Sequence, residues 1–495
     1  MMKYETVIGL EVHAQLLTQS KIFCGCSTKF GQAPNDNTCP ICAGFPGVLP
    51  VLNKKVVEFA IRAGLATHCE IARWSRLARK NYFYPDLPKG YQISQYELPI
   101  CTNGYIDIAF NRVAKRIRLT RIHMEEDAGK NIHDLRSDAS LVDLNRAGIP
   151  LLEIVSEPDI RSAEEAGNYL RTLRAMLQYL DICDGNMEEG SFRCDANVSV
   201  RPEGTTALGT KVELKNLNSF KGVEKAIEFE IRRQIEALSD GGSSLVQETR
   251  LWDPDREETR SMRTKEFAHD YRYFPDPDLL PVAIDEKWIN EIRASLPELP
   301  GARKVRLISQ YDIPAYDAEL LTNRKDVADY FESTLRTHRN PKAIANWITG
   351  DLFRLLKDRK LDEKLYITDW PVGADNLAAM VALIDQGKIS GKIAKTVFEA
   401  MADSGSSPQK IIAEKGLEQV SDPESIEKAI DQVLAAHPKQ VADYQAGSQK
   451  IFGFLVGQIM KATQGKVNPQ KANEILKRRL TEGNEISATS GRKLD

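Results

Sequence analysis

The sequence predicts an α+β protein, with an antiparallel-sheet domain that carries a small zinc-binding insertion, then a helical middle domain and an all-helical tail. Segments with strict period-2 alternation concentrate in the first 295 or so residues, and helices interrupt them without a regular βαβ order. The strand signal fades after Pro297, Pro300 and Gly301. A chain of 495 residues is also too long for one ordinary core. The predicted domains are 1–295, with the insertion at 24–42, then 296–405 and 406–495.

The clearest predicted strand is Glu5 to Leu16. Ile8, Leu10 and Val12 fall on one face, while Glu11 and His13 fall on the other, which is the period of a half-buried strand. Further short strands are expected at 105–110, 116–124, 151–155, 193–200 and 211–214.

Two long helices are predicted among these strands. Residues 162–180 begin with Ser162 and Glu165, the pattern of a capping box, and continue with Leu at helical spacing. Residues 220–238 carry one apolar stripe. Later in the chain, Asn340 and Pro341 mark a helix start, and the Ser-rich segment 402–409 is a candidate linker.

Composition excludes several classes of protein. Hydrophobic residues make up 42% and charged residues 28%, as in ordinary globular proteins, and the net charge of -3 makes any basic surface local. No apolar run reaches the roughly 20 residues of a membrane helix. The first residues pass directly into a strand pattern instead of a signal or transit peptide, so no membrane association and a cytoplasmic location are expected.

Four of the eight cysteines are close in sequence. Cys24 and Cys26 form one pair, and Cys39 and Cys42 form a second pair after twelve intervening residues. Two close pairs on two turns can surround a tetrahedral zinc ion, and four thiolates leave no position for a substrate. The sequence therefore predicts a structural zinc site. The alternative is four reduced cysteines that are close by chance.

Acidic side chains recur on the polar faces of several predicted strands. Glu11 and His13 share one face, Asp195 lies on the polar face of 193–200, and Glu213 lies on that of 211–215. The run His123-Met124-Glu125-Glu126-Asp127 ends another strand. Hard oxygen ligands favour Mg2+, which also binds substrate phosphates. Ordinary solvent-facing sheet is the alternative for any one strand, and alternation does not show that these strands are neighbours.

Basic residues gather in two places. Arg79 to Tyr91 interleaves cations with aromatic rings, which suits either contact with phosphates and bases or packing of a loop. Between Ala446 and Lys493 there are nine Lys and Arg against three Glu, which favours a polyanion contact over a solvated helix face. There is no glycine-rich phosphate loop and no amidase nucleophile region in the sequence, so ATP would be bound through metal-held phosphates.

Several long motifs resemble those of one family, the B subunits of the aspartyl/glutamyl-tRNA(Asn/Gln) amidotransferases (GatB). The resemblance covers essentially the whole chain. Its motifs are Glu5–His13, Lys80–Asp86, His123–Lys130, Ser140–Arg146, Met187–Ser191, Arg193–Asn197, Glu213–Ser219 and Asp270–Pro275.

The resemblance implies a carbon–nitrogen ligase with glutamine as the amide donor, active in a heterotrimer. ATP phosphorylates the side-chain carboxylate of misacylated Glu-tRNA(Gln) or Asp-tRNA(Asn), and ammonia then displaces the phosphate. The glutaminase of the trimer, its A subunit, would supply the ammonia, and the small C subunit would brace the pair. Some family members lack the four cysteines, so zinc would only brace the region.

The family resemblance also assigns site residues. The implied catalytic, Mg2+-binding positions are Glu11, His13, Glu126, Asp195 and Glu213, although the local pattern alone does not separate Glu125 from Glu126. The implied tRNA-binding tail contains Lys461, Lys466, Lys471, Lys477, Arg478 and Arg479.

Two other functions fit parts of the sequence. An ATP-dependent ligase for a small acid needs the acidic face but not the basic tail. A zinc-braced RNA-binding scaffold needs the cysteines and the tail but not Glu11, His13 or Glu213. Removing the tail, or replacing those three side chains by alanine, distinguishes these functions from the one that the resemblance implies.

Overall fold

The computed structural model describes residues 3–110, 113–133, 139–239, 245–264, 270–361, 369–417, 422–463 and 467–490. The chain divides into two compact units, residues 1–303 and 304–495. The first unit contains all the strands of the described chain, and the second is helical. The α+β class with mainly antiparallel sheet is confirmed.

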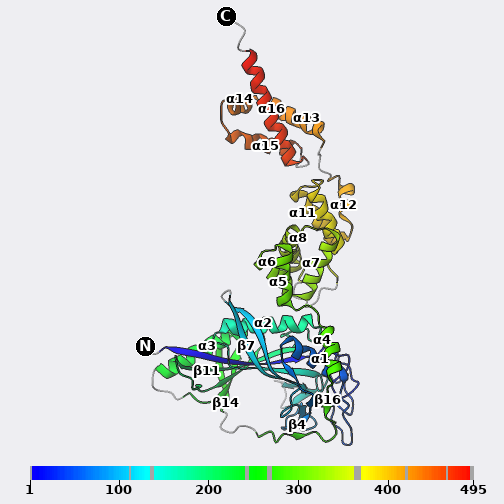
Figure 1. The fold of residues 1–495 in the computed structure, drawn as a ribbon, viewed down its shortest axis with the longest axis vertical. Helices are drawn as coiled ribbons and strands as arrows, with labels where there is room; N and C mark the ends of the chain where they lie inside the picture. Colours follow the sequence, from blue (N-terminus) through cyan, green and yellow to red (C-terminus); the bar gives the residue numbers. More distant parts are fainter. Residues whose placement is uncertain are drawn as a thin grey trace. The chain divides into compact units, whose positions relative to one another are not determined.

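The first unit is built on a nine-stranded sheet (Figure 1). All its neighbouring strands are antiparallel except β12 and β13, which are parallel. In spatial order the strands are β14 (Glu258–Thr264), β13 (Glu248–Asp253), β12 (Val212–Leu217), β11 (Phe192–Pro202), β1 (Tyr4–Gln15), β10 (Pro150–Ser156), β7 (Val113–Glu126), β6 (Cys101–Phe110) and β2 (Glu70–Ile71).

Helices cover one face of this sheet. They are α1 (Lys54–Ala66), α2 (Ala163–Tyr179) and α3 (Phe220–Ser239); α2 packs on β6 and α3 on β11, and Figure 1 shows both helices on the same side of the sheet. The apolar residues of β1, among them Leu10 and Val12, are buried in the core that these helices complete. The polar residues of β1 therefore face the opposite side of the sheet.

The start of α2 agrees with the sequence in part. The Ser162 hydroxyl accepts a hydrogen bond from Glu165 N, as expected of an N-cap. The Glu165 carboxylate, however, accepts from Arg161 N instead of from the backbone of Ser162, and it also pairs with Lys115. The Glu165 carboxylate of the predicted capping box therefore binds the backbone one residue before the N-cap.

Small strands and one further helix complete the first unit. One sheet joins β15, β4 and β5, and two pairs join β16 with β3 and β8 with β9. Helix α4 (Glu286–Ala294) packs with α1. The strands are β3 (Trp74–Ser75), β4 (Ala78–Asn81), β5 (Tyr91–Ser94), β8 (Lys130–His133), β9 (Ser140–Asp143), β15 (Phe274–Pro275) and β16 (Val282–Ala283).

The second unit has two hydrophobic cores, one between Leu307 and Ile412 and one between Ile426 and Leu480. The first is built from α5 (Pro300–Tyr311), α6 (Ala315–Thr322), α7 (Lys325–Thr337), α8 (Pro341–Asn346), the π-helix η1 (Trp347–Leu352), α9 (Phe353–Asp358), α10 (Ala374–Asp385), α11 (Gly391–Ser404) and α12 (Pro408–Lys415). The second is built from α13 (Pro423–Ala436), α14 (Pro438–Gln445), α15 (Lys450–Ala462) and α16 (Pro469–Ser490).

The helical part differs from the sequence-based division in one respect. The sequence predicts a linker at 402–409, but Ile411 and Ile412 pack in the same core as Ala402. Gly405, in the left-handed conformation, ends α11, and Ser407 caps α12, so these residues make a tight turn between packed helices. Among the described helices, none is long and apolar enough to cross a membrane.

Candidate functional site

The site is built on β1, the central strand of the large sheet. β1 is hydrogen-bonded to β11 on one side and to β10 on the other. Because neighbouring residues in register share a face, Glu11 lies beside Asp195, and His13 lies beside Glu153. Glu153 in turn lies opposite His123 on β7. A row of ionisable side chains therefore crosses four strands on the face that the helices leave open.

Two groups of metal-ligating side chains share His13. Ligand atoms of Glu11, His13 and Asp195 lie within 4.8 Å of one another, and so do those of His13, Glu125 and Glu153. His13 Nε2 is 3.7 Å from Glu11 Oε1, 3.8 Å from Glu125 Oε1 and 3.5 Å from Glu153 Oε2. Carboxylate oxygens with one imidazole form a donor set that suits a divalent cation.

The electrostatics of this face show an excess of negative charge. Burial opposes protonation of His123, but Glu153 and Glu125 outweigh it and raise its pKa to about 9. Burial likewise opposes protonation of His13, and Glu153, Glu125 and Glu11 raise its pKa. Burial and the neighbouring Glu153 raise the pKa of Glu11. Against burial, the two imidazoles in turn hold the pKa of Glu153 well below its usual value, so positive charge is favoured at this face, as a bound cation would supply it.

Glu213 joins the site through a lysine. Thr249 Oγ1 donates to Glu213 Oε2 at 2.8 Å, and Lys215 Nζ lies 3.2 Å from Glu213 Oε1. Lys215 also pairs with Asp195. The structure thus connects Glu213 with Asp195, while Glu213 is outside the two three-residue groups.

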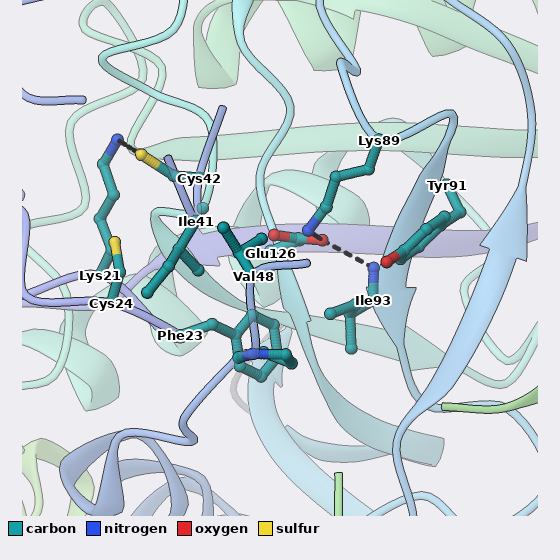
Figure 2. Close-up of a pocket in the computed structure, with 12 residues that line it drawn as sticks. Lys21, Phe23, Cys24, Ile41, Cys42, Val48, Lys89, Tyr91, Ile93 and Glu126 are labelled. Atoms are coloured by element: carbon teal, nitrogen blue, oxygen red, sulfur yellow. Dashed lines mark hydrogen bonds and ion pairs between the residues drawn. The ribbon is translucent and has the colours of Figure 1, made fainter. Parts of the chain in front are cut away.

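Glu126 points away from these groups. As the neighbour of Glu125 on a strand, it faces the other way. Its Oε1 accepts a hydrogen bond from Ile93 N at 2.8 Å and pairs with Lys89. It lines a small cavity of about 30 Å³ together with Cys24 and Cys42, as Figure 2 shows. The geometry therefore brings Glu125, and not Glu126, to His13.

Sequence reasoning missed several residues of this face. Glu153 is the one charged residue in the apolar segment Pro150–Val155, and a buried charge inside an apolar strand is a usable signal of function. Its position beside His13 and His123 depends on strand order, which periodicity does not give. Lys215 escaped notice because nothing local distinguishes it from a solvent-facing lysine.

The four cysteines of the insertion lie together. Their Sγ atoms are all within 4.8 Å of one another, and Cys39 Sγ is 3.9 Å from Cys42 Sγ. The cluster could hold a metal ion, and four thiols at this spacing match the donor set of structural zinc. Hydrogen bonding with Cys24 lowers the pKa of Cys42 to about 4, against burial and with help from Lys21.

Lys21 is a buried residue in contact with the cysteine cluster. Its side chain is fully buried, and its Nζ is 3.5 Å from Cys42 Sγ (Figure 2). The same ammonium donates to Asn37 O at 2.7 Å and to Leu144 O at 3.2 Å. Lys21 therefore joins the cysteine loop to the segment after β9.

The basic tail residues differ in their surroundings. Arg478 and Arg479 pair with Glu427, and Arg479 also lies 3.3 Å from Asp431. Of the predicted tRNA-binding lysines on α15 and α16, Lys461, Lys471 and Lys477 are exposed, where a polyanion can reach them. Lys466 lies outside the described residues.

Comparison with known proteins identifies the family. Residues 6–290 match the family model described as the GatB/GatE catalytic domain, and residues 329–480 match the one described as the GatB domain. The chain belongs to the GatB family. Relatives named as the B subunit of aspartyl/glutamyl-tRNA(Asn/Gln) amidotransferase are similar over their whole length. Those of Geotalea daltonii and Geobacter sulfurreducens are 60% identical over 482 residues, 97% of this chain and 100% of each relative. That of Caldanaerobacter subterraneus is 56% identical with the same coverage.

Within the GatB family match, the catalytic-domain model includes both acidic groups and the four cysteines, because all lie between residues 6 and 290. The basic residues of α15 and α16 fall within the second matched segment, which ends at residue 480. The family thus places the acidic face, and not the tail, in a domain described as catalytic.

Proposed function

We propose that this chain is the part of a tRNA-dependent amidotransferase that activates and amidates the misacylated amino acid. It uses ATP to phosphorylate the side-chain carboxylate of Glu-tRNA(Gln), Asp-tRNA(Asn) or both, and ammonia then converts the product to an amide. The observation that carries this proposal is the pair of acidic groups that share His13, inside the matched catalytic domain.

The chemistry explains why such a site is needed. A carboxylate does not react usefully with ammonia near neutral pH, because oxide is too poor a leaving group. In the first step a carboxylate oxygen forms a bond to the γ-phosphorus of ATP, the bond to the β–γ bridging oxygen breaks, and ADP leaves. In the second step the nitrogen of ammonia bonds to the acyl carbon, the carbon–oxygen bond breaks, and inorganic phosphate leaves with one proton lost from nitrogen.

The acidic face is suited to holding Mg2+ for the first step. Bound Mg2+ neutralises the charge on the transferring phosphates. Glu11, His13 and Asp195 would hold it as one group, and His13, Glu125 and Glu153 offer a second. Lys215 keeps Asp195 and Glu213 in place between the strands. The family resemblance implies that Glu126 also binds Mg2+, and this stays a prediction. In the structure, the Glu126 carboxylate pairs with Lys89.

Partners follow from the chemistry that the chain lacks. The sequence has no amidase nucleophile region, so ammonia would come from a glutaminase, the A subunit of the complex, and the small C subunit would brace the pair. Zinc at the four cysteines would brace the insertion. The exposed lysines on α15 and α16 would contact the tRNA backbone, where each neutralised phosphate contributes to a salt-dependent affinity.

The test uses the complex of this chain with the glutaminase and the small bracing protein. Glu-tRNA(Gln) and Asp-tRNA(Asn) are incubated with ammonia and ATP, and glutamine is omitted so that the glutaminase is not required. Product that depends on ATP and Mg2+ supports the proposal and shows which aminoacyl-tRNA is accepted. A complex that binds tRNA but forms no product would move the chemistry off this chain and favour a scaffold role.

A further inference from the structure

Two motifs with no assigned role meet beside the acidic face. They are Lys80–Asp86, which begins at the end of β4, and Asp270–Pro275, which contains β15. β4 and β15 pair antiparallel, and Asn81 N donates to Tyr271 O at 3.0 Å. The Asn81 amide donates to Arg272 O at 2.8 Å. Arg272 has a φ of 45°, a conformation that a non-glycine residue adopts only where its surroundings enforce it.

The strand alternation of β4 gives its two adjacent cations different surroundings. Arg79 faces one side, where its Nε is 2.9 Å from Asp276 Oδ2 and its Nη2 is 2.8 Å from Asp278 Oδ2. Lys80 faces the other side, directly opposite Gln92 on β5. Arg79 is therefore committed to two carboxylates that fix the segment.

The side that Lys80 faces is the side of the acidic groups. Ser94, two residues from Gln92 and so on the same face of β5, donates from Oγ to Glu125 Oε2 at 3.1 Å. Burial lowers the pKa of Lys80, but Glu125, Tyr273 and Glu153 outweigh it and raise the value. The Lys80 ammonium thus lies in the field of the carboxylates that surround His13.

Lys80 is held by rings rather than by an ion pair. Its Nζ lies 4.9 Å from the centroid of the Tyr271 ring. Tyr271 contacts Tyr82 and Tyr273 edge to face, with centroids 6.1 Å apart in each pair, and Tyr273 stacks on Tyr96 at 4.3 Å. Within the described chain, the Lys80 side chain makes no hydrogen bond or ion pair of its own, unlike Lys89 and Lys215.

A polyanionic substrate needs such a cation here. Triphosphate brought to a face rich in carboxylates is repelled unless positive charge compensates, and an ammonium without a committed carboxylate partner can turn its three donors to phosphoryl oxygens. The tyrosine rings keep Lys80 positioned and desolvated, which strengthens that contact.

From this geometry we infer that Lys80 is a further catalytic residue, whose ammonium binds the oxygens of the phosphoryl group as it passes from ATP to the substrate carboxylate. This inference rests on the proposed function. In the transfer, the bond to ADP breaks as the bond to the carboxylate oxygen forms, and Lys80 stabilises the charge on the phosphoryl oxygens without gaining or losing a proton.

The test compares Lys80→Met with the unsubstituted chain in the full complex. Hydroxylamine replaces ammonia and traps the activated carboxylate as a hydroxamate, so phosphorylation is measured without amidation. Loss of one positioned donor to a transition state costs about 10²–10³ in rate. We expect kcat for hydroxamate formation to fall by that factor in Lys80→Met and by about tenfold in Lys80→Arg, because a planar guanidinium is not equivalent to an ammonium. The Mg2+ concentration that gives the half-maximal rate should not change, and neither should the affinity for tRNA.

Lys221→Met is the matched control, since Lys221 is exposed on α3, over the other face of the sheet. Its rate should equal that of the unsubstituted complex. If thermal unfolding shows that Lys80→Met does not fold, Lys80→Gln carries the same expectation.

A Lys80→Met rate within threefold of the unsubstituted rate would overturn the inference, and so would recovery of the rate at high Mg2+, which would make Lys80 a support of the metal site. These outcomes leave the proposed function intact. Absence of hydroxamate from the unsubstituted, tRNA-binding complex is a different result, because it refutes the proposed function itself.

Discussion

Replacing Lys21 with methionine should weaken both the fold around the cysteine cluster and its hold on a metal. Methionine fills a similar volume but cannot donate, so the Asn37 and Leu144 carbonyls lose their ammonium donor. Leaving a fully buried acceptor unpaired costs about 1–3 kcal/mol, and these two belong to half-buried residues, so the two together should cost about 3 kcal/mol. For the unit formed by residues 1–303, whose entropy of unfolding is about 0.6 kcal/mol per kelvin, that corresponds to a fall in Tm of about 5 °C.

The metal affinity should fall as well, because Lys21 Nζ lies 3.5 Å from Cys42 Sγ and offsets the charge of a four-thiolate site. Loss of a supporting contact of this kind typically lowers metal affinity by about 10–100-fold. The assay is competition for zinc with a chromophoric chelator, beside thermal unfolding. Lys29→Met, on the exposed part of the same loop, is the control. Unchanged zinc affinity and Tm in Lys21→Met would refute the reasoning.

Four further outcomes are expected. Glu213→Ala should abolish phosphorylation of the aminoacyl group in the hydroxamate assay while tRNA binding persists; loss of both would contradict a metal-binding role. Cys39→Ser should loosen local folding, seen by limited proteolysis, more than it changes intrinsic rate, and a fully metallated, protease-resistant variant would count against zinc. Because the pKa of His123 is raised from 6.5 to about 9, its protonation stabilises the metal-free fold below pH 6.5 and is lost as the pH rises to about 9. Tm should therefore fall across that interval, and Glu153→Gln should flatten the slope; an equal slope in both proteins would exclude this cause. Removing residues 422–495 should raise the apparent KM for charged tRNA without lowering the saturated rate, whereas an unchanged KM would favour the small-acid ligase.

Periodicity predicted six of the nine strands of the main sheet and missed β2, β13 and β14. The segment expected from Glu5 to Leu16 is β1, Tyr4–Gln15, and the strand expected at 151–155 is β10, Pro150–Ser156. These strands are half-buried or buried, so their side-chain pattern records the sheet directly. Strands of two to four residues, such as β4 and β15, escaped because so few residues show no period.

The site was predicted less completely than the fold. Glu11, His13 and Asp195 were found from alternation and resemblance, and the structure brings them together. Predicting the second group, His13 with Glu125 and Glu153, requires knowing that β1 pairs with β10. That pairing connects His13 to Glu153 across a long separation in sequence. Local pattern carries no information about such pairing. The single parallel pair of the described sheet, β12 with β13, was not predicted because β13 itself was not expected as a strand.

The central place of β1 has a consequence for synthesis of the chain on the ribosome. β1 is translated before the strands that flank it, β10 and β11, which begin at Pro150 and Phe192. Asp195 is made roughly 180 residues after Glu11, which at bacterial-type elongation rates of about 5–20 residues per second is a delay of roughly 10–40 s. Until β10 is made, roughly 140 residues after Glu11, this half-buried strand has neither of its partners, a state prone to aggregation. The nascent chain therefore completes its acidic site only after β11 has been made.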